Sequence, residues 1–157
     1  MILWHGSSVA VPRPDVLHSR DRVDFGRGFY ATPLRGQAAR LCARFARLGQ
    51  DAVLSRYEFD EPAAAAFSCL RFPGYTDEWL SFVLKCRNGE DDTAFDIVRG
   101  GVANDKVFNT VELFFNGLIS QEEALRRLRY EKPNEQICFR SQRAIDLCLR
   151  FLGTETP

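Results

Sequence analysis

The stretch that organises the chain is Asp24-Phe25-Gly26-Arg27-Gly28-Phe29-Tyr30-Ala31-Thr32, where two glycines flank an arginine and an aromatic pair follows. Gly26 and Gly28 can take positive φ values and let another molecule approach the main chain closely. Strand alternation places the side chains of Phe29 and Tyr30 on opposite faces. A tight turn that exposes its backbone and leads into an aromatic strand suits a flat ligand.

The overall composition is that of an ordinary globular protein. Its 157 residues are enough for one domain with a substantial core, so we expect residues 1–157 to form a single domain. Basic and acidic residues number 21 each, and the zero net charge argues against a dedicated DNA-binding module. A nucleic acid held at one small site as a substrate remains compatible with this balance.

Cysteine usage and the N-terminus indicate the compartment. The 5 cysteines show no CxxC spacing, which is typical of free thiols in a reducing environment and indicates neither a disulfide framework nor zinc. The first residues lack the pattern of a signal peptide, and no apolar run reaches membrane-spanning length. We therefore expect a cytoplasmic protein with no metal and no membrane partner.

Hydrophobic periodicity predicts strands and helices without a regular βαβ order. Strands are expected at residues 1–5, 29–32, 52–59, 95–98 and 135–139, the first of them in the centre of a sheet. Helices are expected at residues 33–48, 76–85, 106–116, 120–128 and 141–152. Residues 63–72 show no clear pattern, and Asn104-Asp105 suits a helix cap. This mixture predicts the α+β class.

Two short motifs, Leu3-Trp4-His5-Gly6-Ser7 and Phe25-Gly26-Arg27-Gly28-Phe29-Tyr30, occur together in the N-terminal part. In combination they resemble the NAD-binding signature of the ADP-ribosyltransferases, in the poly(ADP-ribose) polymerase and diphtheria-toxin branch named for a His, a Tyr and a Glu. A third stretch, Asn134-Glu135-Gln136-Ile137-Cys138-Phe139, is similar to the late strand that supplies the Glu. The resemblance implies a split antiparallel β-sheet core with flanking helices. The whole chain further resembles a small bacterial family of that clan, in the Trp79 segment and in residues 96–98, 102–105 and 136–139.

This resemblance implies transfer of ADP-ribose from NAD with release of nicotinamide, and it assigns three catalytic residues. His5 would hydrogen-bond a ribose hydroxyl, and Tyr30 would offer an aromatic face to the nicotinamide. Glu135 would bond the ribose 2′-hydroxyl and stabilise the cationic sugar electrostatically. The main chain of Gly6 would bond the carboxamide. The remaining NAD-binding residues implied are Ser7, Arg27, Gly28, Ala31 and Gln136.

Several of these assignments carry alternatives. Ser7 also suits a plain turn, and Arg27 either contacts a phosphate of NAD or is solvated. The second aromatic expected after Tyr30 is replaced by Leu41, so Phe45 or Trp79 is a candidate substitute.

The position of the catalytic acid also has alternatives. A one-residue slip in register exchanges Glu135 for Gln136, because neighbouring strand residues face opposite ways. In that case another acid such as Asp105 would be needed.

Three functions follow from these patterns. The first is an NAD-dependent mono-ADP-ribosyltransferase that modifies a protein or nucleic acid, by analogy an intracellular toxin with an antitoxin partner. The second is an NAD-dependent RNA 2′-phosphotransferase, for which Arg20, Arg22 and Arg27 are candidate phosphate ligands. The third is a catalytically degenerate module that binds NAD, ADP-ribose or a protein, which Leu41 favours.

Overall fold

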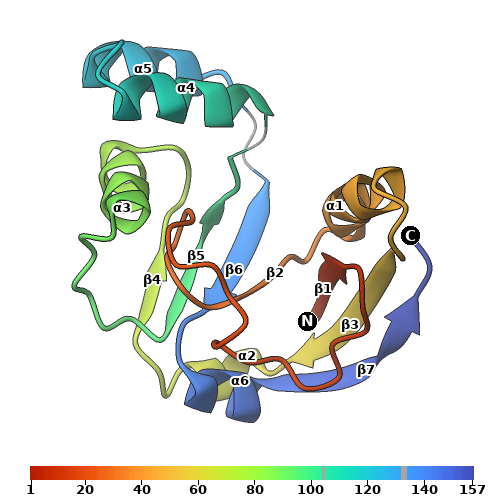
Figure 1. Cartoon of the computed structure of the whole chain (residues 1–157). Helices are drawn as coiled ribbons and strands as arrows, with labels where there is room; N and C mark the ends of the chain where they lie inside the picture. Colours follow the sequence, from red (N-terminus) through yellow and green to blue (C-terminus); the bar gives the residue numbers. More distant parts are fainter. Residues whose placement is uncertain (104, 132–133) are drawn as a thin grey trace.

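The structure, a computed structural model, describes residues 1–103, 105–131 and 134–157, and its described part is α+β as predicted (Figure 1). None of the helices in these ranges is long and apolar enough to cross a membrane. The strands are β1 (Ile2–Ser7), β2 (Phe29–Ala31), β3 (Val53–Phe59), β4 (Cys69–Arg71), β5 (Ile97–Gly101), β6 (Glu135–Phe139) and β7 (Leu149–Glu155). The helices are α1 (Arg35–Arg47), α2 (Glu61–Ala64), α3 (Asp77–Asn88), α4 (Asp105–Phe115), α5 (Gln121–Leu128) and α6 (Gln142–Cys148).

The strands form two sheets. One has three strands in the order β1-β3-β7, all antiparallel, and the other has four in the order β2-β6-β5-β4. The expectation of a wholly antiparallel core is wrong at one place, because β4 and β5 run parallel. Helix α3 lies between these two strands in the chain and supplies the long crossover that a parallel pair requires.

In the described part of the chain, the backbones of the two sheets are joined by one isolated β-bridge, between Trp4 of β1 and Thr32, just after β2. Each residue donates its N–H to the other's carbonyl, over 2.8 and 2.9 Å. Strand β1 was expected in the centre of a sheet but lies at the edge of its own sheet. Its outer edge is used for this bridge to β2.

The four-stranded sheet is covered on both faces. One face carries Val98 and Cys138 and packs with Trp79 beneath α3 and α4. The opposite face carries Ile137 and packs with Leu3 of the first sheet. Figure 1 shows α3, α4 and α5 at the four-stranded sheet and α1 beside the three-stranded one.

The local sequence predicts several helix boundaries correctly. The side chain of Thr76 accepts a hydrogen bond from the N–H of Trp79, and Ser120 accepts one from Glu123, so both expected caps are present. Helix α1 lies within the predicted range. Residues 63–72, which showed no pattern, contain the end of α2 and all of β4.

The predicted final helix over residues 141–152 is too long. Helix α6 ends at Cys148, and β7 follows it at once. Leu149 and Phe151 alternate with Arg150, a spacing that suits a strand, and the free edge of β3 pairs with them. Tertiary pairing therefore decides the conformation of this segment.

Candidate functional site

The backbone of β1 and β2 separates immediately after the Trp4–Thr32 bridge. The bridge is isolated, so the pairing does not continue to Gly6 and Tyr30. In an antiparallel strand every second residue directs its N–H and C=O to the same side. The N–H and C=O of Gly6 therefore point to the same side of β1 as those of Trp4, but they take no part in a bridge to β2.

His5 lies on β1 between Trp4, which is bridged to Thr32, and Gly6. Its Nδ1 lies 2.7 Å from the carbonyl oxygen of Tyr30, and its ring packs 4.7 Å from that of Phe29. Burial lowers the pKa of His5 below the ordinary value of 6.5, and the bond to the Tyr30 carbonyl opposes this shift. A carbonyl only accepts, so Nδ1–H donates to it and Nε2 is left as an acceptor in the neutral ring.

Gly6 is required by the packing of β1 on α1. A Cβ at this position would lie 2.4 Å from the carbonyl oxygen of Ala38 and 2.9 Å from Sγ of Cys42. The absence of a side chain thus has a structural reason beside the expected approach of a ligand. Ser7 follows with its hydroxyl donating to the carbonyl of Val9, which is the turn-forming alternative.

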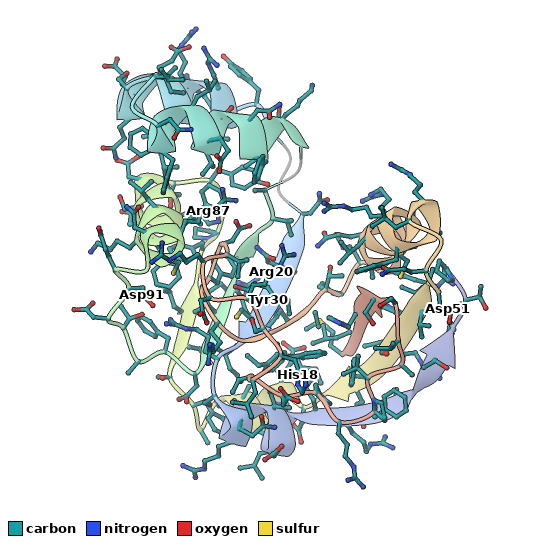
Figure 2. All side chains as sticks on the ribbon, viewed as in Figure 1. His18, Arg20, Tyr30, Asp51, Arg87 and Asp91 are labelled. Carbon is teal, nitrogen blue, oxygen red and sulfur yellow. The ribbon has the colours of Figure 1, made fainter. Side chains whose placement is uncertain are left out.

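Tyr30 stabilises the turn at residues 24–28, which we call the glycine turn. Its hydroxyl donates to the carbonyl of Gly26 over 2.6 Å and accepts from the N–H of Phe25 over 3.0 Å. Burial raises the pKa of Tyr30 well above 10. Figure 2 labels Tyr30 among the side chains of the whole molecule. The side chain of Tyr30 shares a sheet face with Cys138, its partner in register, while His5 packs on the face of Phe29. The side chains of His5 and Tyr30, two of the predicted catalytic residues, therefore lie on opposite faces of β2.

The other residues of the glycine turn have local partners. A Cβ on Gly28 would lie 2.5 Å from Sγ of Cys138, so close packing on β6 requires glycine there. Arg27 is exposed and pairs with Asp21 over 2.6 Å. It lines a cavity of about 380 Å³ at the far end of β6 from Glu135. Ala31 is buried in the core, with 4% of its surface exposed.

Strand β6 places Glu135 and Gln136 on opposite faces, as strand alternation requires. Gln136 is 8% exposed, and its amide donates to Oδ2 of Asp24 over 3.2 Å. Glu135 faces the other way, where Oε1 accepts two hydrogen bonds from Arg99, over 2.6 Å and 3.2 Å. Of these two neighbours, Glu135 is thus the one that lines an open cavity.

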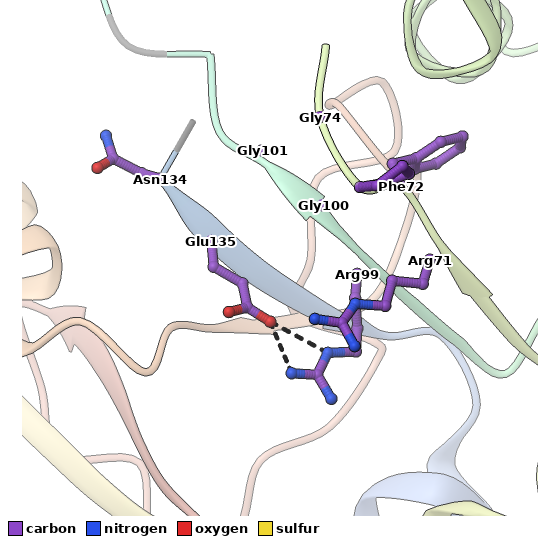
Figure 3. A pocket seen from close by; sticks show the side chains of 9 residues that line it. Arg71, Phe72, Gly74, Arg99, Gly100, Gly101, Asn134 and Glu135 are labelled. Atoms are coloured by element: carbon purple, nitrogen blue, oxygen red, sulfur yellow. Dashed lines mark hydrogen bonds and ion pairs between the residues drawn. The ribbon is translucent and has the colours of Figure 1, made fainter. Parts of the chain in front are cut away.

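The cavity beside Glu135 has a volume of about 180 Å³ (Figure 3). Its lining consists of Arg71, Phe72, Pro73, Gly74, Arg99, Gly100, Gly101, Asn134 and Glu135. Both bonds from Arg99 end on Oε1, and Oε2 of Glu135 has no hydrogen bond to any described residue. Oε2 is therefore available to accept a hydrogen bond from a ligand hydroxyl.

The main chain of Glu135 connects this cavity to the bridge between the sheets. Its carbonyl accepts from the hydroxyl of Thr32 over 2.7 Å and from the amide of Gln37 over 3.3 Å. Because Thr32 is bridged to Trp4, the strands β1, β2 and β6 converge at this point. The bridge beside His5 and the main chain of Glu135 are thus linked by one connected set of hydrogen bonds.

An ionic network that the sequence did not reveal lies on the face of β6 that carries Gln136. Arg87 pairs with Asp24 over 2.8 Å and with Glu112 over 2.7 Å, and the side chains of Arg87 and Asp24 are 12% and 13% exposed. Asp24 also accepts from Gln136. The network joins the glycine turn to α3, α4 and β6, so it fixes which face of β6 is turned toward the core.

No second stacking aromatic stands at the expected place. Leu41 is 41% exposed on α1, and Phe45 is half-buried on the same helix. Trp79 is wholly buried, with its indole donating to the carbonyl of Gly101 over 3.2 Å, so it is a core residue and cannot stack on a ligand. Asn104 and the side chain of Asp105, the alternative acid, lie outside the described part of the chain.

The chain belongs to the family described as protein of unknown function (DUF3990), whose profile matches residues 1–151. No curated protein and no solved structure matches the chain.

Proposed function

We propose that this protein is an NAD-dependent mono-ADP-ribosyltransferase with an ADP-ribosyltransferase-like fold. The observation that carries the proposal is the convergence of β1, β2 and β6: Thr32, which is bridged to Trp4 of β1, donates its hydroxyl to the main-chain carbonyl of Glu135, and Gly6 follows Trp4 on β1 beyond that bridge. Two sheets joined by a single bridge are what a split-sheet fold would have. The three motifs from which the resemblance was inferred lie on these three strands.

Each residue has a definite task in this reaction. The N–H and C=O of Gly6 bond the nicotinamide carboxamide in the opening between β1 and β2. Oε2 of Glu135 accepts the ribose 2′-hydroxyl while Arg99 holds Oε1. The bond between nicotinamide and C1′ of the ribose breaks and its electron pair leaves with nicotinamide. An acceptor nucleophile then bonds C1′ and gives up its proton.

Glu135 contributes chiefly electrostatic stabilisation of the cationic sugar. Removing one preorganised electrostatic group from an active site costs about 10²–10³-fold in rate. His5 supplies a neutral ring whose Nε2 accepts from a ribose hydroxyl. In this proposal the ring of Tyr30 offers its face to the nicotinamide, while its hydroxyl holds the glycine turn.

Incubation with labelled NAD in a cell extract tests the proposal. Label should pass to a protein or a nucleic acid, and Glu135→Gln should abolish the transfer. Glu58→Gln is the matched control, since Glu58 also pairs with an arginine, Arg150, but its side chain is exposed and does not line the cavity. Equal labelling by wild type and Glu135→Gln would reject the proposal. The labelled molecule would identify the acceptor, and suppression of the labelling by a second protein would identify an antitoxin partner.

Exposed Leu41 supports a second candidate function, a module that binds NAD or ADP-ribose without transfer. Such a module would give heat on calorimetric titration with NAD but release no nicotinamide. The RNA 2′-phosphotransferase has less support, because Arg20, Arg22 and Arg27 do not line the cavity of Glu135.

A further inference from the structure

The cavity beside Glu135 contains two arginines from neighbouring strands. Arg71 of β4 and Arg99 of β5 are direct partners in the parallel register, so their side chains share one face of the sheet. Like charges placed directly opposite each other across strands destabilise a sheet. The repulsion between Arg71 and Arg99 is therefore either offset by nearby acidic side chains or retained because the two arginines have a function, such as binding an anion.

Among the described residues, acidic side chains pair with only one of these two arginines. Arg99 is 17% exposed and pairs with Glu135 over 2.6 Å and with Glu61 of α2 over 3.4 Å. Arg71 is exposed, and its side chain has no hydrogen bond or ion pair with any residue that the structure describes. Figure 3 shows the guanidinium groups of Arg71 and Arg99 beside the carboxylate of Glu135.

The charge and size of the cavity suit a small anion. Among the described residues its ionisable lining is Arg71, Arg99 and Glu135, which give a net charge of +1 from two cations and one anion. Its volume of about 180 Å³ is below the roughly 300 Å³ at which pockets for whole small molecules begin. It therefore takes one group of a larger ligand.

We propose that this cavity is a phosphate subsite in which Arg71 is the principal ligand. The planar fork of a guanidinium donates two parallel hydrogen bonds to phosphate oxygens, and Arg71 has all its donors free of described partners. Arg99 adds positive potential while it holds Glu135. The phosphate group belongs either to the diphosphate of the ADP-ribose donor or to a phosphorylated acceptor.

Calorimetric titration of the whole protein with inorganic phosphate at low ionic strength tests the proposal without any need for NAD chemistry. Wild type should bind phosphate with millimolar affinity, and Arg71→Ala should weaken binding at least about tenfold, as expected for loss of charge-assisted bonds. Arg71→Lys should retain part of the affinity because it keeps the charge but loses the fork. Arg47→Ala, at an exposed arginine on α1, is the matched control and should bind as wild type does.

Two further titrations distinguish the sources of the phosphate. Weaker binding of ADP-ribose by Arg71→Ala assigns the cavity to the donor. Weaker binding of a 5′-phosphorylated dinucleotide, with ADP-ribose unaffected, assigns it to the acceptor. Phosphate binding that is absent from wild type, or equal in wild type and Arg71→Ala, overturns the subsite even if the protein transfers ADP-ribose. Phosphate binding by a protein without NAD-linked activity would instead reject the proposed function alone.

Discussion

Asp21 lies three positions before Asp24, where the glycine turn begins, and each of these acids pairs with an arginine. Replacing each of them by asparagine therefore isolates the effect of burial on the contribution of an ion pair to stability. Asp24 is 13% exposed and accepts two bonds from Arg87, over 2.8 and 3.2 Å. Asp21 is 66% exposed and pairs with Arg27 over 2.6 Å. The two acids thus make similar bonds in different surroundings.

The structure gives the expected size of each effect. Breaking a buried ion pair costs about 3–5 kcal/mol because it leaves one charge without compensation. Arg87 keeps Glu112 at 2.7 Å as a second partner, so Asp24→Asn should reduce the free energy of unfolding by only about 2–3 kcal/mol. Asp21→Asn removes an exposed pair and should cost about 0–1 kcal/mol.

Urea unfolding followed by tryptophan fluorescence measures both values, since Trp79 is wholly buried and its emission changes on unfolding. The slope of the free energy against urea concentration should be the same in both variants and in wild type. If Asp24→Asn and Asp21→Asn cost the same, the network around Arg87 does not hold the glycine turn against β6.

Three further predictions concern the site. Tyr30→Phe leaves the N–H of Phe25 without its partner and should lower the free energy of unfolding by about 1–3 kcal/mol; an unchanged denaturation midpoint would contradict the role of the hydroxyl. Gly6→Ala places a Cβ against α1 and should cost about 1–3 kcal/mol, whereas Gly36→Ala, in an open position of the same helix, should add about 0.5–1 kcal/mol in the same assay. The folded-state pKa of His5 lies below 6.5, so the unfolded chain binds the proton more readily; stability from neutral His5 is present above pH 6.5 and is lost as the pH falls from there through the lowered pKa. His5→Asn should flatten that part of the stability-against-pH curve, and an identical curve would refute it.

Sequence patterns predicted the elements whose signals are local. The caps at Thr76 and Ser120 depend on bonds to residues three positions later, and β6 has the predicted bounds. Strand β7 could not be identified in this way, because its conformation depends on pairing with β3, about ninety residues earlier in the chain.

The candidate site shows the same division between local and distant information. The motifs located His5, Tyr30 and Glu135 on three strands that the structure brings together. They did not indicate that the hydroxyl of Tyr30 bonds Gly26, because the path of the glycine turn depends on the distant pair of Asp24 and Arg87. The contact between Arg99 and Glu135 depends on the register of β5 with β6, which no short pattern contains.

We propose above all that the carboxylate of Glu135 acts in breaking the bond between nicotinamide and ribose. The most direct measurement is the rate of nicotinamide release from NAD by wild type and Glu135→Gln, together with the Kd for NAD of each. We expect Glu135→Gln to bind NAD as wild type does and to release nicotinamide about 10²–10³-fold more slowly. Equal rates in the two proteins, or no nicotinamide release by wild type with a competent cell extract, would contradict the claim.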